Sequence, residues 1–267
     1  MTPLLHYLDQ GAGPATLVIL HGLFGTLDNW QTLARRWADE AGLRVVSVDL
    51  RNHGRSFHSP AHSYELMAQD VLTLLDHLSL PPARLSLLGH SMGGKVAMRL
   101  ALDAPQRLAR LLVLDIAPRA SDMLHQAPIV AGLQAVNLAA LQSRAEADAA
   151  LARHIRQPGV RQFLLKNLYR DADNRFAWRI NLPVLAAQVA AIGAETSAET
   201  PFLKPTLFLR GGLSDYISAD DKLHGIPALF PNSEVVTVSD AGHWLHAEKP
   251  DEVFALVRDF ILMNDKQ

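Results

Sequence analysis

The sequence contains no cysteine in its 267 residues. This absence excludes disulfide bonds, a thiolate nucleophile and zinc sites built from cysteine. The sequence also has no run of 18 apolar residues, and its first residues show neither the basic stretch nor the long apolar segment of a secretory signal. We therefore expect no membrane span, and a cytoplasmic location is the simplest expectation.

Charge is sparse and balanced. Charged residues make up 19% of the chain, the net charge is −2, and 49% of the residues are hydrophobic. This composition supports a large core and disfavours disorder. Because no basic stripe is present, we expect no nucleic-acid partner. The expected partner is a small-molecule substrate, and the chain is expected to be a monomer or a homodimer.

Short apolar segments rich in β-branched residues alternate with longer segments of helical periodicity. This alternation predicts an α/β fold with a mostly parallel central sheet flanked by helices. The expected strands are 16–20, 44–48, 85–88, 108–114, 205–209 and 234–238, and the expected helices are 30–41, 64–78, 92–104 and 251–262.

The alternation stops in residues 117–200, where alanine and leucine dominate and prolines mark the two boundaries. We predict a core domain of residues 1–116 and 201–267 with an inserted all-helical cap, or lid. Ligands of open α/β sheets bind beyond the carboxyl ends of the strands, where this insertion emerges, so the cap is expected to cover the site. The alternative is a second helical layer unrelated to the site. The helices expected in the insertion are 124–141, 144–155, 160–169 and 181–192.

Gly89-His90-Ser91-Met92-Gly93 fits the pattern G-x-S-x-G between an expected strand and an expected helix. In this pattern a sharp strand-to-helix turn exposes a serine hydroxyl at the end of the sheet. The turn is strained, so the two positions of the pattern that lie two residues before and after the serine are glycines, which lack a Cβ that would clash with the helix. The pattern predicts Ser91 as a nucleophile.

A serine nucleophile needs a base and an acid that orients the base. The pattern places the histidine after the acid and near the C-terminus, and His243 follows the last expected strand. His246 lies close by in the sequence but is expected to face solvent or to form a hydrogen bond within its loop. Asp115 and Asp215 each follow an expected strand on the same side of the sheet, so the residues alone leave both as candidates for the acid.

The oxyanion hole needs two backbone N–H groups. We expect one from Met92, directly after the nucleophile, and one from Leu23 in the loop after the first expected strand, with Phe24 as the alternative to Leu23. His53 follows the 44–48 strand and could be mistaken for a base. We interpret it, together with His21 and His90, as structural support for the loops around the serine.

Apolar residues around these loops are expected to form an acyl-binding pocket. No His-x-x-x-His pair on an expected helix and no cluster of carboxylates appears, so no metal site and no cofactor is predicted. The expected pocket residues are Leu23, Phe24, Met92, Tyr216 and Trp244, with Trp178 reaching in from the cap.

These residues together resemble the α/β-hydrolase superfamily over almost the whole chain. The resemblance is closer to the small YbfF-type bacterial esterases and their mitochondrial abhydrolase relatives. It implies an α/β-hydrolase fold and a Ser–His–Asp esterase that needs no cofactor. The segments that carry it are 21–30, Asp49-Leu50-Arg51-Asn52-His53-Gly54, 89–95, Asp115-Ile116-Ala117-Pro118, Trp178-Arg179-Ile180-Asn181-Leu182 and 242–250.

The resemblance also bears on the acid. The position matching Asp215 is often not acidic in the closer relatives, which favours Asp115, yet Asp215 is present here at the offset from Gly212 that the wider superfamily uses. Both therefore stay candidates, with a preference for Asp115.

The expected function is hydrolysis of short- to medium-chain acyl esters, and possibly thioesters, through a covalent acyl-enzyme. One alternative is another reaction on the same scaffold, such as perhydrolysis, C–C bond hydrolysis or acyl transfer. Another is a non-catalytic binding protein with a hydrolase fold. Dehalogenases and epoxide hydrolases are disfavoured, because they carry an aspartate where this chain has Ser91.

Overall fold

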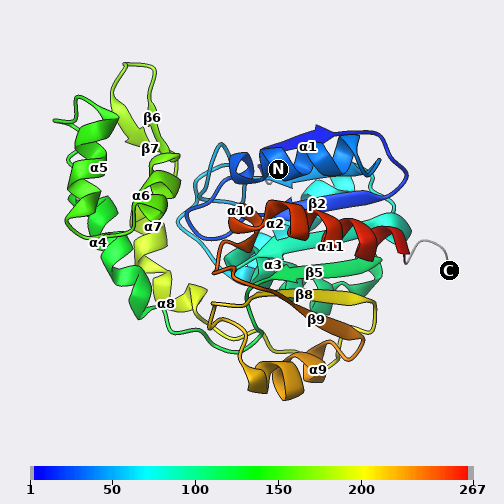
Figure 1. The fold of residues 1–267 in the computed structure, drawn as a ribbon. Coiled ribbons are helices and arrows are strands. Elements are labelled where there is room, and N and C mark those ends of the chain that lie inside the picture. Colours follow the sequence, from blue (N-terminus) through cyan, green and yellow to red (C-terminus); the bar gives the residue numbers. More distant parts are fainter. Residues whose placement is uncertain (1–2, 264–267) are drawn as a thin grey trace.

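A computed structural model describes residues 3–263, apart from the side chain of His125. A seven-stranded sheet forms its centre, in the order β1-β3-β2-β4-β5-β8-β9 (Figure 1). The first strand is antiparallel to its neighbour, and every other neighbouring pair is parallel. The strands are β1 (Tyr7–Gln10), β2 (Thr16–Leu20), β3 (Arg44–Val48), β4 (Leu85–His90), β5 (Arg110–Leu114), β8 (Thr206–Gly211) and β9 (Ser233–Val238).

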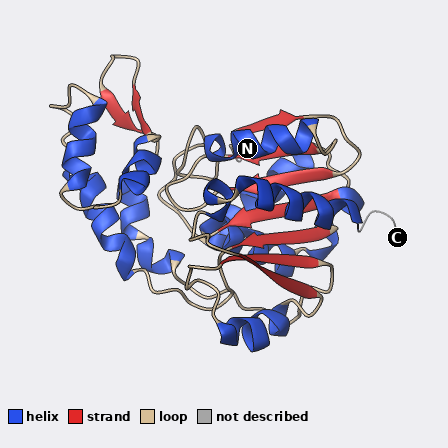
Figure 2. Cartoon of the chain, in the orientation of Figure 1, coloured by secondary structure: helices blue, strands red, loops and turns tan. Residues whose placement is uncertain are grey.

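Helices cover both faces of this sheet (Figure 2). Buried side chains form one cluster with α2 and α3 on one face and a second cluster with α1 and α11 on the other. The helices of this part are α1 (Gln31–Asp39), α2 (Tyr64–His77), α3 (Met92–Asp103), α9 (Ile226–Leu229), α10 (Leu245–Glu248) and α11 (Pro250–Met263). The prediction of an α/β fold with a mostly parallel sheet is confirmed.

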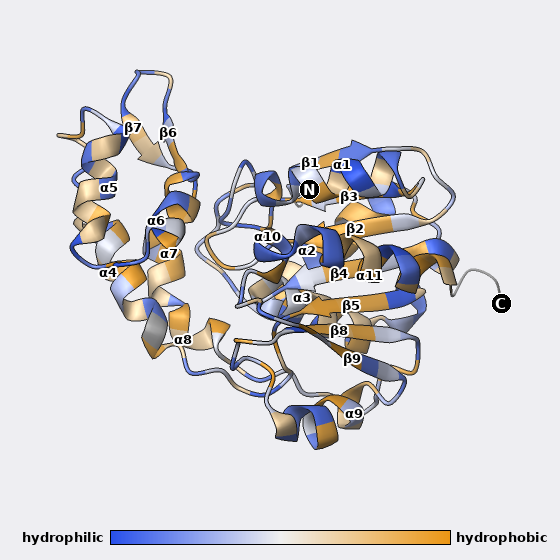
Figure 3. Ribbon diagram, in the orientation of Figure 1, coloured by the Kyte–Doolittle hydropathy of each residue, from blue (hydrophilic) through white to orange (hydrophobic). Residues whose placement is uncertain are grey.

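The strands are apolar on both faces because each face meets helices. In β2, Val18 and Leu20 pack toward α2 and α3, whereas Leu17 and Ile19 pack toward α1 and α11. This alternation is the period of two expected for a strand. The apolar colour of the strands and the hydrophilic patches on the surrounding helices follow this arrangement (Figure 3).

Residues between β5 and β8 form an insert that lies to one side of the sheet, on the left of Figure 1. The insert has its own cluster of buried apolar residues, to which the core contributes Phe24. Its helices are α4 (Ala127–Ala135), α5 (Arg144–Ala152), α6 (Pro158–Leu165), α7 (Leu182–Ala187) and α8 (Val189–Ile192).

The expectation of an all-helical insert is wrong. A short antiparallel pair, β6 (Leu168–Arg170) and β7 (Phe176–Trp178), follows α6. The Asp171 side chain accepts hydrogen bonds from the backbone N–H groups of Asp173 and Arg175, and Asn174 has a φ of 61°. Aspartate and asparagine close tight turns in this way, so the hairpin had a local signal in the sequence.

Other boundaries also differ from the expectation. The edge strand β1 was not predicted, because it is short and mostly polar. The helix expected over 124–141 is shorter, with Val136 in an extended conformation directly after α4. The helix expected over 181–192 is divided at Gln188 into α7 and α8.

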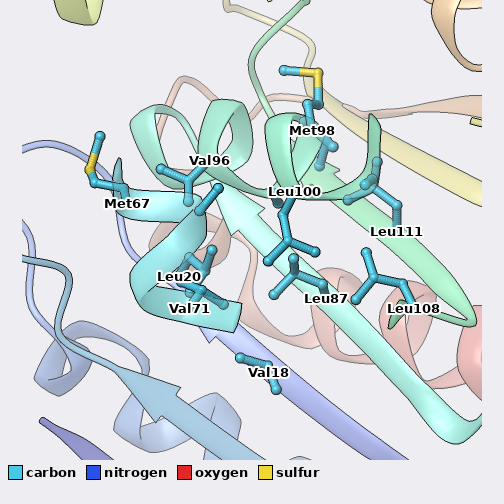
Figure 4. Packing of buried hydrophobic residues seen from close by; sticks show 14 of the residues in the cluster. Val18, Leu20, Met67, Val71, Leu87, Val96, Met98, Leu100, Leu108 and Leu111 are labelled. Atoms are coloured by element: carbon cyan, nitrogen blue, oxygen red, sulfur yellow. The ribbon is translucent and has the colours of Figure 1, made fainter. Parts of the chain in front are cut away.

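The packing of the central strands generates a stability prediction. Leu87 in β4 is fully buried in the same apolar cluster as Val71, Val96 and Leu100, which Figure 4 labels. Truncation to alanine leaves a cavity in a close-packed region, so Leu87→Ala should lower the free energy of unfolding by about 2–5 kcal/mol. Urea unfolding measures this change, and Leu223→Ala, at a residue 70% exposed, is the control expected within about 0.5 kcal/mol of the wild type. An equal effect of the two substitutions would contradict the packing described here.

Candidate functional site

Ser91 stands in a strained turn between β4 and α3. Its φ of 53° and ψ of −118° are rare for a residue with a side chain. The turn brings the first residues of α3 against the strand ends, and the two flanking glycines make this approach possible. A Cβ at Gly89 would lie 2.1 Å from the Gly93 carbonyl oxygen, and a Cβ at Gly93 would lie 2.5 Å from the carbonyl oxygens of Leu20 and His21.

His243 faces Asp115, which follows β5. The His243 Nδ1–H group donates to Asp115 Oδ2 over 2.8 Å, and Asp115 is completely buried. The other carboxylate oxygen accepts from the Gly211 N–H group at 2.8 Å, and the Ser214 hydroxyl donates to Oδ2. With both oxygens engaged, the carboxylate is held in one orientation, which in turn fixes the imidazole tautomer.

Two further contacts hold the His243 imidazole and its loop. The Tyr216 ring stacks on the imidazole, with 4.0 Å between centroids. Burial raises the pKa of Tyr216 to about 12, so its phenol stays neutral at ordinary pH. His90 Nε2–H donates to the His243 carbonyl oxygen over 2.8 Å, and burial holds the pKa of His90 well below its usual value. His90 thus supports the loop as a neutral ring.

Asp215 lines a pocket together with His243 but forms no hydrogen bond with its imidazole. Asp215 is exposed, and its backbone carbonyl oxygen accepts a hydrogen bond from Arg119 at 3.1 Å. Within the described residues its carboxylate makes no hydrogen bond or ion pair. Of the two candidate acids, the structure brings only Asp115 against His243.

The N–H groups of Phe24 and Leu23, in the loop after β2, differ in whether they have an acceptor. The Phe24 N–H group donates to His53 Nε2 over 3.2 Å, and the Phe24 carbonyl accepts from Asn167 Nδ2 at 2.7 Å. Among residues 3–263, the N–H groups of Leu23 and Met92 donate to no protein acceptor. The alternative donor Phe24 is therefore occupied, whereas the two expected donors are available.

Buried polar side chains fix the loops around Ser91. The Asp49 carboxylate accepts from the N–H groups of Leu27 and Arg55 at 2.8 and 2.9 Å. His21 accepts from the Leu50 N–H group at 3.0 Å, while His53 binds the Arg51 carbonyl oxygen at 3.0 Å. Through these contacts His21 and His53 hold the backbone of the loop after β3, as expected for structural residues.

Ser91 and His243 line one cavity of about 170 Å³. The Ser91 hydroxyl has no hydrogen-bond partner within the described residues; such contacts often tighten only when substrate binds. The apolar part of the wall comes from the insert and from loops of the core. These wall residues are Leu23, Phe24, Trp30, Ile129, Val160, Phe163, Leu164, Tyr216 and Trp244.

Two expected pocket residues lie away from this cavity. Trp178 in β7 is 9% exposed and packs within the cluster of the insert. Met92 is the first residue of α3, and its side chain packs in the apolar core of the sheet. Phe163 and Ser214 were not predicted, because they come together with the site only in the folded chain. Ser214 had a weak local signal in its position after the glycine pair 211–212.

The insert is joined by hydrogen bonds to loops at the strand ends. Asn181 binds Asn52 twice, through its N–H group to the carbonyl oxygen at 2.9 Å and through Nδ2 to Oδ1 at 3.0 Å. His58 Nε2 binds the Arg179 carbonyl oxygen at 3.0 Å. With the Asn167–Phe24 bond, these contacts hold the insert beside the cavity.

The described part of the chain contains neither a candidate metal site nor a candidate membrane span. No group of three or more histidine, aspartate or glutamate residues there is arranged to hold a metal ion. No helix within residues 3–263 is long and apolar enough to cross a membrane.

Comparison with known proteins agrees with this architecture. The model of the alpha/beta hydrolase fold family matches residues 15–250. The chain belongs to the α/β-hydrolase family. It is 42% identical to the sn-1-specific diacylglycerol lipase ABHD11 of Mus musculus, over 95% of this chain and 83% of that protein. It is 38% identical to esterase YbfF of Escherichia coli K12, over 92% of each chain.

A solved structure is also similar. An esterase from a marine microorganism superposes with a TM-score of 0.93 and 35% identity, over 97% of this chain and all of that one. The resemblance to esterases and their abhydrolase relatives is thereby confirmed, and these relatives support a hydrolase of the esterase or lipase type.

The buried histidines make stability depend on pH. Burial lowers the pKa of five of them, to about 4 for His62 and about 3 for His246, and lowers it also for His21, His53 and His90. Each gains a proton near pH 6.5 when the chain unfolds. The free energy of unfolding should therefore be retained above pH 6.5 and should decrease as pH falls toward 4, because unfolding then takes up protons at these histidines.

Urea unfolding at pH 7.5, 6.0 and 5.0 measures this proton uptake. His246→Phe should reduce it by about one proton, because phenylalanine keeps an aromatic ring against Trp30 but does not titrate. His224→Gln, at an exposed residue, should leave the pH dependence unchanged. A free energy of unfolding that is constant from pH 7.5 to 5.0 would contradict the account.

Proposed function

We propose that the protein is a serine carboxylesterase that hydrolyses short- to medium-chain acyl esters through a covalent acyl-enzyme. The observation that carries the proposal is the cavity that both Ser91 and His243 line, with His243 hydrogen-bonded to the buried Asp115. The names of the esterase and lipase relatives support the same class of reaction.

Each group has a defined part in the proposed mechanism. Ser91 Oγ attacks the acyl carbonyl carbon while His243 Nε2 takes the hydroxyl proton. Asp115 keeps the proton on Nδ1 and stabilises the imidazolium that forms. The N–H groups of Leu23 and Met92 bind the oxyanion of the tetrahedral intermediate.

The C–O bond to the alcohol then breaks, and His243 gives its proton to the leaving alkoxide. In the second half, water loses a proton to His243 and attacks the acyl-serine ester. Release of the carboxylic acid restores Ser91. No cofactor takes part in this sequence.

The volume and the apolar lining of the cavity support a substrate with a short- to medium-length acyl chain. A volume of about 170 Å³ lies below the roughly 300–1,000 Å³ of pockets for drug-sized ligands. Phe163 and Val160 from α6 form part of its apolar wall, so the insert of residues 117–200 acts in this proposal as a cap that completes the acyl site. Thioesters with the same acyl groups are further candidate substrates.

Hydrolysis should depend on Ser91. Removal of its hydroxyl eliminates the nucleophile, so Ser91→Ala should lower kcat by on the order of a millionfold. Steady-state rates with p-nitrophenyl esters from acetate to palmitate, and with matching acyl-CoA thioesters, test this and locate the preferred chain length. Turnover that is equal in wild type and Ser91→Ala would overturn the proposal.

Substitution of Asp115 and substitution of Asp215 should have different effects on kcat. Asp115→Asn removes the charge that stabilises the His243 imidazolium and should lower kcat by about 10⁴-fold. Asp215→Asn is the matched control, because this residue is exposed and its carboxylate forms no hydrogen bond or ion pair with the imidazole; its kcat should stay within about twofold of wild type. Circular dichroism spectra of the variants check that both fold. Similar kcat values for the two variants would contradict the assignment of Asp115.

A further inference from the structure

The insert is attached to the core through two connecting segments, residues 118–121 and 193–196, which pair with each other. The Ser121 N–H group donates to the Gly193 carbonyl oxygen at 2.8 Å, and the Thr196 N–H group donates to the Pro118 carbonyl oxygen at 2.7 Å. Their approach is close: a Cβ on Gly193 would lie 2.6 Å from the Ser121 carbonyl oxygen. The entry and the exit of the insert thus form one junction.

The side chain of Lys95 ends in this junction. Lys95 lies in the first turn of α3, one turn after Ser91, and is 1% exposed. Its Nζ donates to the carbonyl oxygens of Arg119 at 2.7 Å and Pro118 at 3.5 Å in the entry segment, and to that of Ala194 in the exit segment. The three donors of the ammonium group therefore meet three carbonyls from both segments.

This position is unfavourable for a cation in two respects. Burial removes the ammonium group from water, which lowers the pKa of Lys95 to about 8, with Arg119 adding to the effect and Glu195 opposing it. The first turn of a helix also disfavours positive charge because of the helix dipole. Within the described residues Lys95 forms no ion pair, so the three carbonyl contacts are what compensate the buried charge.

We propose that Lys95 is a positioning residue that fixes the insert over the cavity by binding both connecting segments to the helix that begins at Ser91. The insert contributes Ile129, Val160 and Phe163 to the cavity wall, whereas Ser91 and His243 belong to the core. A short acyl group meets mainly the core, and a longer acyl group also meets the insert. Lys95 therefore sets how well the site accepts longer acyl groups.

The inference rests on the proposed esterase function and is tested by a ratio. The ratio compares kcat/KM for p-nitrophenyl hexanoate with kcat/KM for p-nitrophenyl acetate. A change in His243 or Ser91 should lower kcat/KM for both esters, whereas a displaced insert should lower kcat/KM mainly for the hexanoate. In Lys95→Met the ratio should fall by about tenfold, mainly through a higher KM for the hexanoate.

Arg99→Met is the matched control. Arg99 lies one turn further along α3 and donates to the Ser197 carbonyl oxygen at 2.7 Å, but it does not reach the entry segment. Its substitution also removes one cation from the helix, and the ratio should stay at the wild-type value. An unchanged ratio in folded Lys95→Met, or an equal fall in Arg99→Met, would overturn the inference.

Gly193→Ala decides the question if Lys95→Met does not fold. The added methyl group forces the two connecting segments apart without changing Lys95 or the catalytic residues. The same fall in the ratio is expected, and an unchanged ratio would overturn the inference.

Hydrogen exchange separates a failure of this inference from a failure of the proposed function. The amides of Ser121 and Thr196 should exchange faster in Lys95→Met than in wild type and Arg99→Met, whether or not any ester is hydrolysed. Equal exchange in all three proteins would overturn the positioning role. If wild type hydrolyses neither ester, the proposed function fails, and the exchange rates still test how Lys95 holds the insert.

Discussion

The close approach of α3 to the ends of β2 and β4 is the constraint on which the site depends. Ser91 can reach its strained backbone conformation because Gly89 and Gly93 leave room for backbone against backbone. The same approach brings the turn at Ser91 against the loop that contains Leu23, where a Cβ on Gly22 would lie 3.3 Å from Ser91 Cβ. A side chain at either glycine would separate the helix from the strands and move Ser91 and Met92 away from the loop that contains Leu23.

Strained backbone is concentrated at this edge of the sheet. Phe24, Ser91 and Asp115 all have φ values between 50° and 60°, in a region that side chains seldom occupy. Each lies directly after or near the end of a parallel strand, where three loops converge. Buried, neutral histidines and the Asp49 carboxylate hold these loops. The free energy lost to strain and to burial of polar groups is offset by the large apolar clusters on both faces of the sheet.

Local sequence patterns were sufficient to predict the parallel sheet and its flanking helices, and they named Ser91 and His243, which line one cavity. They could not choose between Asp115 and Asp215, because both follow strands at the same edge and only the folded chain shows which carboxylate is buried against the imidazole. The β6–β7 hairpin had a turn signal that helical periodicity obscured. The limit of prediction from local sequence is clearest for Trp178, which was expected in the cavity, and Phe163, which lines it. The packing of the insert decides which aromatic side chain faces the cavity, and a local sequence pattern does not determine that packing.

A serine-directed fluorophosphonate tests the central claim, that Ser91 is an activated nucleophile, most directly. Cleavage after Arg84 and Lys95 releases residues 85–95 as one peptide, which contains Ser86 and Ser91, and fragmentation by mass spectrometry distinguishes the two. The account predicts one adduct per chain, located on Ser91, that forms much more slowly in Asp115→Asn than in Asp215→Asn. An unlabelled wild-type protein, or an adduct on another residue, would contradict it.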